Sequence, residues 1–334
     1  MADPTERETQ ATRTSFGYGR DGGPSLHDDL LALITMLLAE RAMHGGSMMV
    51  RPSRSSTTAE LWRVFRGLVN TREPWLADPG FLEVQDRVLQ ALISGEARIE
   101  GAPDVSDDGV TTVLAPSDDD AEPGRQGVVR SYGGVRAVEA APIDPHGRVG
   151  LWRGDITRLA VDAIVNAANA RLLGCWQPNH LCIDNAIHTF AGVQLRIACA
   201  EMVANLRREF GADYEEPTAR ARVTDAFNLP SRRVIHTVGP IVADGRPTTA
   251  QREQLAQCYR ACLDAAADEG ARTVALCAVS TGVFGFPVEQ AAPIAVQTVR
   301  DWLDQSGERG AGVGVVFDVF SIRDEVIYRD ALGM

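Results

Sequence analysis

The sequence predicts an α/β fold with one sheet between helical layers, preceded by a small helical unit. From residue 148 onward, short apolar runs alternate with longer amphipathic ones, which is the pattern of strands and helices that follow one another along a chain. Between residues 25 and 95, every periodic segment has helical spacing instead. A stretch of acidic sequence without either periodicity separates the two parts.

Composition and charge restrict the class of protein. The formal net charge of −12 argues against electrostatic binding to nucleic acid or to an anionic membrane, so neither partner is expected. A small anionic ligand remains compatible, because backbone amides at a helix N-terminus hold phosphate without basic side chains. The first residues lack a secretory signal, and the longest apolar run, Leu30 to Ala39, has ten residues against the ~20 that span a bilayer. We therefore expect a cytoplasmic protein with free or metal-bound cysteines.

The N-terminal third is predicted to contain a tail, a helical unit and a linker. Residues 1–24 are polar and predict a disordered tail. Ser25 and Asp28 resemble a capping box that begins a first helix, and helical spacing predicts two more over 58–69 and 79–93. Residues 25–95 then form a helical extension that caps the main domain, with an independent function as the alternative. Seven acidic and no basic residues between Gly101 and Gly124 predict a flexible linker over 101–135.

The remaining chain alternates between strands and helices, as an α/β domain requires. Strands are predicted at Val149–Trp152, Ala163–Asn166, Arg220–Thr224, Val234–Val238, Val274–Val279 and Val313–Phe320. Helices are predicted over Ile183–Gln194 continuing into Arg208, over Thr249–Glu269 and over Val288–Gln305.

Two cysteines and one histidine fall within eight residues, at Cys175, His180 and Cys182. Zinc prefers thiolate and imidazole ligands, and a site with three protein ligands keeps one position open for water or substrate. The cluster therefore indicates a zinc site with an open position. Buried free thiols beside a hydrogen-bonded histidine are one alternative. A structural site closed by a distant fourth ligand is another, and the residues considered for that ligand are Cys199, Cys277 and His188.

A second candidate element is the glycine-containing turn between a predicted strand and the helix that begins near Pro287. Its glycines let the backbone approach a ligand, and amides at such a turn cradle a pyrophosphate. Ligands of open α/β sheets bind beyond the strand C-termini, where this turn is predicted to lie. An ordinary strand-to-helix turn is the alternative. The turn consists of Ser280, Thr281, Gly282, Val283, Phe284, Gly285 and Phe286.

Polar residues near predicted strand ends are further candidates. Asn166 and Asn169 close a strand and open a loop, where one amide could orient a ribose hydroxyl or form a turn. Asp155 could accept a hydrogen bond from an adenine amine, or serve as a turn residue. Asp184 follows the cysteine cluster and could orient or deprotonate a water, or cap a helix.

Together these segments resemble the macrodomain family. The motifs that carry the resemblance, in the family's order, are Gly154–Thr157, Val161–Asn169, Val234–Pro240 and Ser280–Pro287. The segment 174–188 further resembles the zinc-containing branch of microbial macrodomains, which are protein-ADP-ribose hydrolases. Other macrodomains carry a glycine run where this chain has the Cys/His insertion. That branch also carries an N-terminal helical extension similar to residues 25–95, whereas the acidic linker is longer than the family pattern.

The resemblance implies a macrodomain over residues 148–334, with a mixed sheet in a three-layer α/β/α sandwich and ADP-ribose in a cleft at the strand ends. It implies that Asp155 binds adenine, that Ile156 adds a backbone contact and that Phe320 packs near the base. The turn from Ser280 to Phe286 would wrap the diphosphate and approach the distal ribose. These assignments come from the family and not from residue spacing.

The resemblance also implies the catalytic residues and the metal ligands. Asn169 would hold distal-ribose hydroxyls, and Asp184 occupies the position of the acidic residue used by zinc-free hydrolytic relatives. Cys175, His180 and Cys182 would ligate Zn²⁺. The implied activity is removal of mono-ADP-ribose from modified proteins, with zinc polarising the anomeric centre or lowering the pKa of a water toward ~7. A reader that binds ADP-ribose around a structural zinc and an O-acetyl-ADP-ribose deacetylase remain as alternatives.

Overall fold

The computed structural model describes residues 18, 23–46, 52–99, 111–113, 129–131, 139–140 and 147–334. Nearly all of the predicted tail, residues 1–24, and most of the predicted linker, residues 101–135, lie outside the described residues. Within the linker range, β1 (Thr111–Val113) pairs antiparallel with β2 (Val129–Ser131) and parallel with β5 (Leu159–Ala160). At these two places the chain forms strands of a small sheet and is not irregular.

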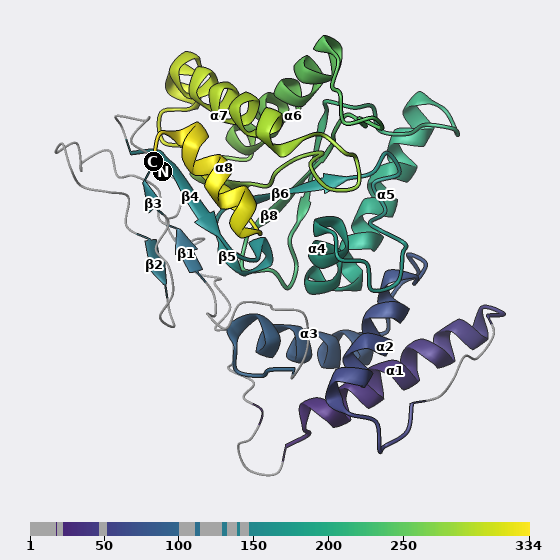
Figure 1. The fold of residues 1–334 in the computed structure, drawn as a ribbon. Coiled ribbons are helices and arrows are strands. Elements are labelled where there is room, and N and C mark those ends of the chain that lie inside the picture. The colour runs from purple at the N-terminus through teal and green to yellow at the C-terminus, as the bar shows by residue number, and fades with distance from the viewer. Residues whose placement is uncertain are drawn as a thin grey trace, which may run out of the picture.

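The predicted helical extension contains α1 (Leu26–Met43), α2 (Thr58–Asn70) and α3 (Pro79–Ser94). The capping box of Ser25 and Asp28 is present at the start of α1, as the sequence predicts. Buried side chains of all three helices belong to the same hydrophobic core as those of the sheet domain. The extension packs beside α4 in Figure 1, so the two parts of the chain share one continuous core.

A seven-stranded mixed sheet forms the centre of the larger part. Its order is β3-β4-β10-β9-β6-β8-β7, with parallel pairing from β4 to β8 and antiparallel strands at both edges. The central strands are buried on both faces, as the continuous apolar runs of the sequence indicate. The strand bounds are Glu139–Ala140 (β3), Val149–Arg153 (β4), Ala163–Ala168 (β6), Ala221–Asp225 (β7), Arg233–Val238 (β8), Thr273–Leu276 (β9) and Gly314–Val319 (β10).

Helices cover both faces of this sheet and complete the predicted three-layer sandwich. Figure 1 shows α6, α7 and α8 together on one side, and α4 and α5 on the other. The bounds are Ile183–Ala191 (α4), Val193–Phe210 (α5), Thr249–Asp268 (α6), Val288–Gln305 (α7) and Ile322–Leu332 (α8), with short 3₁₀ turns at Ile156–Arg158 (η1) and Gly307–Arg309 (η2). Among the described residues, none of the helices combines the length and hydropathy that a bilayer crossing needs.

Two helical features differ from the sequence prediction. The helix predicted to continue from Ile183 into Arg208 is broken at Gly192, which has φ +91° and ends α4 before α5 begins. The sequence pattern does not predict helix α8, because five of its eleven residues are charged and it buries only Tyr328 and Leu332. Its ring contact between Tyr328 and Phe317 fixes it against β10.

Parallel pairing brings the carboxyl ends of five strands to one edge of the sheet. The segments that follow β4, β6, β9 and β10 contain Asp155, Asn169, Ser280 and Phe320 respectively. These positions are far apart in sequence, but the sheet order places their strands next to one another. This edge is where open α/β sheets bind ligands.

Candidate active site

The ends of β4 and β10 form one side of the candidate site. The backbone amide of Gly154 donates to the carbonyl of Val319 over 3.0 Å, which holds the segment after β4 beside Phe320. The Phe320 side chain is 68% exposed, so its ring is free to cover a ligand. Oδ1 of Asp155 accepts hydrogen bonds from the amide and the hydroxyl of Thr157, and Asp155 thereby caps the start of the 3₁₀ turn η1. Asp155 is therefore a turn residue in this structure, and its second oxygen is not used by that turn.

The turn from Ser280 to Phe286 connects β9 to α7. The amide of Phe286 donates to the Ser280 carbonyl over 3.0 Å, and the amide of Gly285 donates to the Gly282 carbonyl over 3.0 Å. The amide of Val242 donates to the carbonyl of Phe284 over 2.7 Å, so a second segment supports the turn. Gly285 has φ +71°, and a Cβ there would lie 2.6 Å from the Val242 carbonyl oxygen. Glycine is therefore required at this position.

Ser280 begins this turn with a strained backbone. Its φ is +67°, a left-handed conformation that is costly for a residue with a Cβ. Its hydroxyl is buried and has no hydrogen-bond partner in the structure. The Val283 side chain, at the tip of the turn, is 76% exposed. A strained residue with an unpaired polar group is typical of a ligand-binding turn.

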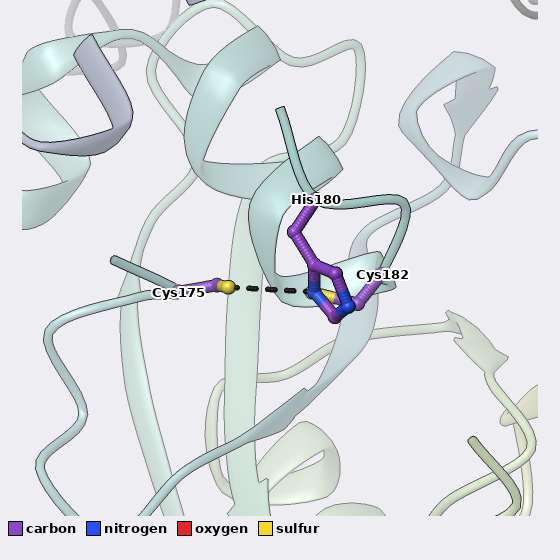
Figure 2. Close-up of side chains that lie close together, drawn as sticks. All are labelled: Cys175, His180 and Cys182. Carbon is purple, nitrogen blue, oxygen red and sulfur yellow. Dashed lines mark hydrogen bonds between the residues drawn. The ribbon is translucent and has the colours of Figure 1, made fainter. Parts of the chain in front are cut away.

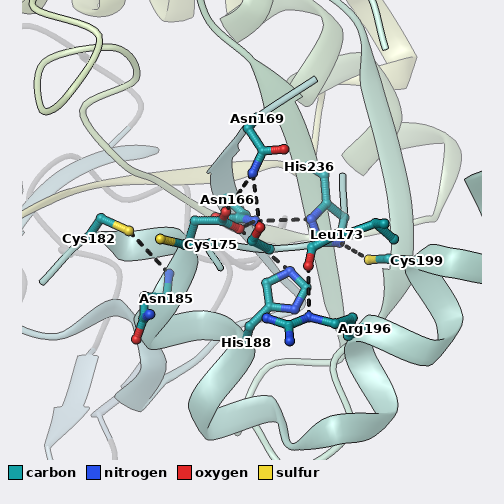
Figure 3. A network of polar contacts seen from close by, with 12 residues as sticks. Asn166, Asn169, Leu173, Cys175, Cys182, Asn185, His188, Arg196, Cys199 and His236 are labelled. Atoms are coloured by element: carbon teal, nitrogen blue, oxygen red, sulfur yellow. Dashed lines mark hydrogen bonds and ion pairs between the residues drawn. The ribbon is translucent and has the colours of Figure 1, made fainter. Parts of the chain in front are cut away.

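Asn166, Asn169 and Asp184 form a hydrogen-bonded group at the end of β6. The Asn166 amide donates to Oδ1 of Asp184 over 2.8 Å, and the Asn169 amide donates to Oδ2 over 3.3 Å. Asn169 also donates to the Gly174 carbonyl over 3.1 Å, which connects the group to the loop that follows. Figure 3 shows both asparagines converging on this network. The two residues predicted to be catalytic, Asn169 and Asp184, are therefore in direct contact.

Burial changes the ionisation of this group. It raises the pKa of the Asp184 carboxyl to about 6, although the hydrogen bonds from both asparagines and the charge of Arg196 act in the opposite direction. The imidazole of His188, whose Nε2 lies 3.5 Å from Oδ1 of Asp184, has a pKa lowered well below its ordinary value, first by burial and then by His236 and Arg196. Asp184 thus has no protonated histidine beside it near neutral pH.

The cysteine cluster lies on the loop between β6 and α4. Sγ of Cys175 is 3.5 Å from Nδ1 of His180, and the candidate ligand atoms of Cys175, His180 and Cys182 all lie within 4.8 Å of one another (Figure 2). Cys182 is also the N-cap of α4, where its sulfur accepts a hydrogen bond from the Asn185 amide. A helix N-terminus favours a thiolate at this position.

The protonation of Cys182 bears on whether the cluster fits a metal ion. Burial raises the pKa of this thiol to about 12, and the nearby Cys175 and Asp184 add to the increase. A divalent cation between the three side chains would supply the missing positive charge and favour the thiolates. The donor set, the mutual distances and the helix N-terminus therefore fit a single zinc-like ion.

The three residues considered as a fourth ligand lie elsewhere. His188 and Cys199 form a separate buried group with His236, and Cys277 is buried just after β9. Nδ1 of His236 accepts from the Asn166 amide over 3.1 Å, which leaves the ring proton on Nε2, 3.0 Å from the Thr224 hydroxyl. Of the residues that the structure describes, none of these three joins the Cys175 cluster.

Several residues that position the loop have no counterpart among the sequence predictions. The Arg196 guanidinium donates to the carbonyls of Leu173, Val69 and Arg72 and lies 4.5 Å over the Trp176 ring. Its sequence signal was an arginine on the buried stripe of α5. The side chains of Arg66 and Asn70, from α2, also contact this region. Nothing in their local sequence indicates that role.

Comparison with known proteins identifies the family to which this chain belongs. A model of the Macro domain family matches residues 165–295. The protein-ADP-ribose hydrolase of Treponema medium is 41% identical over 267 residues, which is 79% of this chain and 85% of that protein. The protein-ADP-ribose hydrolase of Staphylococcus aureus (strain MRSA252) is 36% identical over 291 residues, covering 87% and 91% respectively.

A solved structure shows the same fold. The crystal structure of the Trypanosoma brucei macrodomain is 27% identical, with a TM-score of 0.50, and the match covers 80% of this chain and 92% of that chain. This chain belongs to the macrodomain family. The fold predicted from the sequence, a macrodomain with an N-terminal helical extension, is therefore confirmed.

Proposed function

We propose that this protein is a hydrolase that removes mono-ADP-ribose from modified proteins and holds one zinc ion at Cys175, His180 and Cys182. The contacts between the cysteine cluster and the candidate catalytic residues support this proposal most strongly. The cysteine cluster is joined to Asn169 through the Gly174 carbonyl, and Asn169 in turn contacts the buried Asp184. A candidate metal site on the loop after β6 and a candidate catalytic carboxylate in the first turn of α4 therefore lie next to each other.

The chain's own residues would bind and orient the substrate. We assign the adenine to Asp155, the Ile156 backbone and Phe320, because these follow adjacent strands and Phe320 is exposed. The turn from Ser280 to Phe286 would hold the diphosphate through its backbone amides and the unpaired Ser280 hydroxyl. Bound in this way, the ligand would have its distal ribose directed toward the loop after β6.

Asn169 and Asp184 would act on the scissile bond. Asn169 would orient a hydroxyl of the distal ribose, and Asp184 would orient the attacking water and accept its proton. Water then replaces the protein side chain at the ribose carbon, which releases ADP-ribose and the unmodified side chain. When bound, zinc would supply Lewis acidity at the reacting ribose.

The charge of the chain favours a protein substrate over nucleic acid. A net charge of −12 gives no electrostatic attraction to a phosphate backbone or an anionic bilayer, so we propose neither as a partner. We propose a cytoplasmic location, where reducing conditions keep Cys175 and Cys182 available as ligands. The relatives named protein-ADP-ribose hydrolase support the substrate class.

The test is release of ADP-ribose from a mono-ADP-ribosylated protein, with and without a chelator. We expect chelation to lower the rate at least about 100-fold and added zinc to restore it. Cys182→Ala should be equally slow and should not respond to zinc. Gln177→Ala, an exposed side chain in the same loop, serves as the control and should retain the wild-type rate.

A different experimental result would contradict each part of the proposal. Full activity of the chelated protein would exclude the zinc assignment. Tight binding of ADP-ribose without any turnover would make the protein a reader, and turnover of only O-acetyl-ADP-ribose would make it a deacetylase.

A further inference from the structure

We infer that helix α2 of the N-terminal extension positions the metal-binding loop, through the side chains of Asn70 and Arg66. This inference rests on the proposed function in one respect, since it assigns the loop a metal. It gives the extension a role in the chemistry of the site, beyond covering the sheet domain.

Asn70 connects the extension to the loop and to α4 at once. Its side chain is at the C-terminal end of α2 and is 1% exposed. Oδ1 accepts a hydrogen bond from the backbone amide of Asn179 over 3.0 Å, and Nδ2 donates to the Thr189 hydroxyl over 3.1 Å. Loss of this side chain would leave the half-buried amide of Asn179 without its acceptor, whereas the Thr189 hydroxyl would keep its bond to the Asn185 carbonyl.

The position of Asn179 makes this contact relevant to the metal ligands. Asn179 immediately precedes His180 and has φ +56°, a left-handed conformation that asparagine adopts more readily than most residues with a Cβ. The bond from Asn70 holds its amide in place, so it fixes the direction in which the chain enters His180. Gly67, one turn earlier on α2, leaves room for the loop, because a Cβ there would lie 3.2 Å from Nδ2 of Asn179.

Arg66 supports the other end of the cluster. Its Nη2 donates to Oδ1 of Asn185 over 3.0 Å, and Nδ2 of Asn185 donates to the Gln177 carbonyl over 3.1 Å. The backbone amide of the same asparagine donates to Sγ of Cys182. Arg66 therefore orients the residue that contacts both the middle of the loop and one candidate ligand.

A site with only three protein ligands depends strongly on such support. Ordering a flexible loop costs conformational entropy, so a metal ion that must order its own site binds more weakly than one that meets a site already ordered. Partners that fix the orientation of the ligands are known to change metal affinity by about 10–100-fold. Asn70 and Arg66 supply this support from a part of the chain outside the matched family region, residues 165–295.

The test measures zinc affinity of the full chain by competition with a chromophoric chelator. We expect Asn70→Ala to bind zinc about 10-fold more weakly, and Arg66→Ala about 5-fold more weakly, than wild type. Arg63→Ala, which removes an exposed side chain of the same helix, is the matched control and should bind as wild type does. Thr189→Val breaks the bond between α2 and α4 but keeps the bond from Asn179 to Asn70. This variant should therefore lose less zinc affinity than Asn70→Ala does.

A second measurement does not require the metal. Amide hydrogen exchange at Asn179 in chelated protein should become about 10-fold faster in Asn70→Ala, because the acceptor of that amide is gone. If wild type binds no zinc, the metal assignment under the proposed function fails, and the exchange rates still decide whether α2 positions the loop. If Asn70→Ala does not fold, Arg66→Ala decides by zinc affinity and by exchange at Asn185. Wild-type zinc affinity and wild-type exchange in both variants would overturn the inference.

Discussion

The side-chain amide of Asn166 donates a hydrogen bond to Oδ1 of Asp184 over 2.8 Å, and both side chains are buried. Asn166 lies in β6 and Asp184 lies in the first turn of α4, so this bond joins the sheet to the helix that follows the cysteine loop. A carboxylate held by two amide donors has a defined orientation and little freedom to exchange partners. The loop between these two elements is therefore anchored at both ends.

Replacement of Asp184 by asparagine should reduce catalysis much more than ligand binding. Asp184→Asn removes the proposed proton acceptor, and we expect kcat to fall at least about 100-fold. Since both Asn166 and Asn169 present N–H groups, the new amide cannot accept from both, and stability should fall by about 1–2 kcal/mol. Single-turnover kinetics measure the loss of catalysis, chemical denaturation measures the loss of stability, and calorimetric titration with ADP-ribose measures the smaller effect on ligand binding.

The control for this variant is Asp213→Asn, which changes an exposed carboxylate on the loop after α5. It should leave both kcat and ADP-ribose affinity unchanged. Wild-type kcat in Asp184→Asn would remove Asp184 from the mechanism.

The buried His236 predicts a pH dependence of stability. Burial lowers the pKa of His236 from 6.5 to about 4, so the unfolded chain binds more protons than the folded protein between these values. Stability therefore rises with pH in this window and is lost as the pH falls through it. From pH 7 to pH 5 we expect this one group to lower the free energy of unfolding by about 2 kcal/mol.

Urea unfolding of wild type and of His236→Gln at both pH values isolates this contribution. Other groups titrate in the same range, including Asp184, so the difference between the two proteins is the informative quantity. The variant should lose about 2 kcal/mol less than wild type between pH 7 and pH 5. Equal losses in the two proteins would show that His236 is not the group responsible.

Ser280 should show opposite effects on stability and on binding. Ser280→Gly removes a left-handed φ from a residue with a Cβ and deletes an unpaired buried hydroxyl, so the free energy of unfolding should rise by about 1 kcal/mol. If the hydroxyl binds the diphosphate, ADP-ribose affinity should fall about 5–10-fold. Chemical denaturation and calorimetric titration measure the two quantities.

Ser280→Ala separates the two causes, because it removes the hydroxyl but keeps the Cβ and the strained backbone. It should match Ser280→Gly in the loss of affinity and gain less stability. Wild-type affinity in both variants would exclude the hydroxyl from ligand binding.

The sequence was sufficient to predict most elements of the fold because their signals are local. The capping box at Ser25, the apolar strands and the amphipathic α6 and α7 all agree with their sequence patterns. Helix α8 was missed because it buries too few side chains to leave a periodic pattern, and the break between α4 and α5 depends on Gly192 alone.

The supporting residues of the site could not be predicted for a different reason. Cys175, His180 and Cys182 are close in sequence, so their spacing is itself a signal. Asn70 and Arg66 act on residues more than a hundred positions away, and only the packing of α2 against α4 brings them there. Periodicity describes which face of a helix is buried, but it does not identify what that face contacts.

The bond between Asn70 and Asn179 also has a consequence for synthesis on the ribosome. The two residues are 109 positions apart, so the helical extension emerges long before the loop that it contacts. The loop lies between β6 and α4, and β6 pairs with two strands, β8 and β9, that emerge later still. The strand that carries this loop therefore completes its pairing only after β9 has been translated. Metal loading that depends on the anchored loop would then follow the synthesis of most of the sheet.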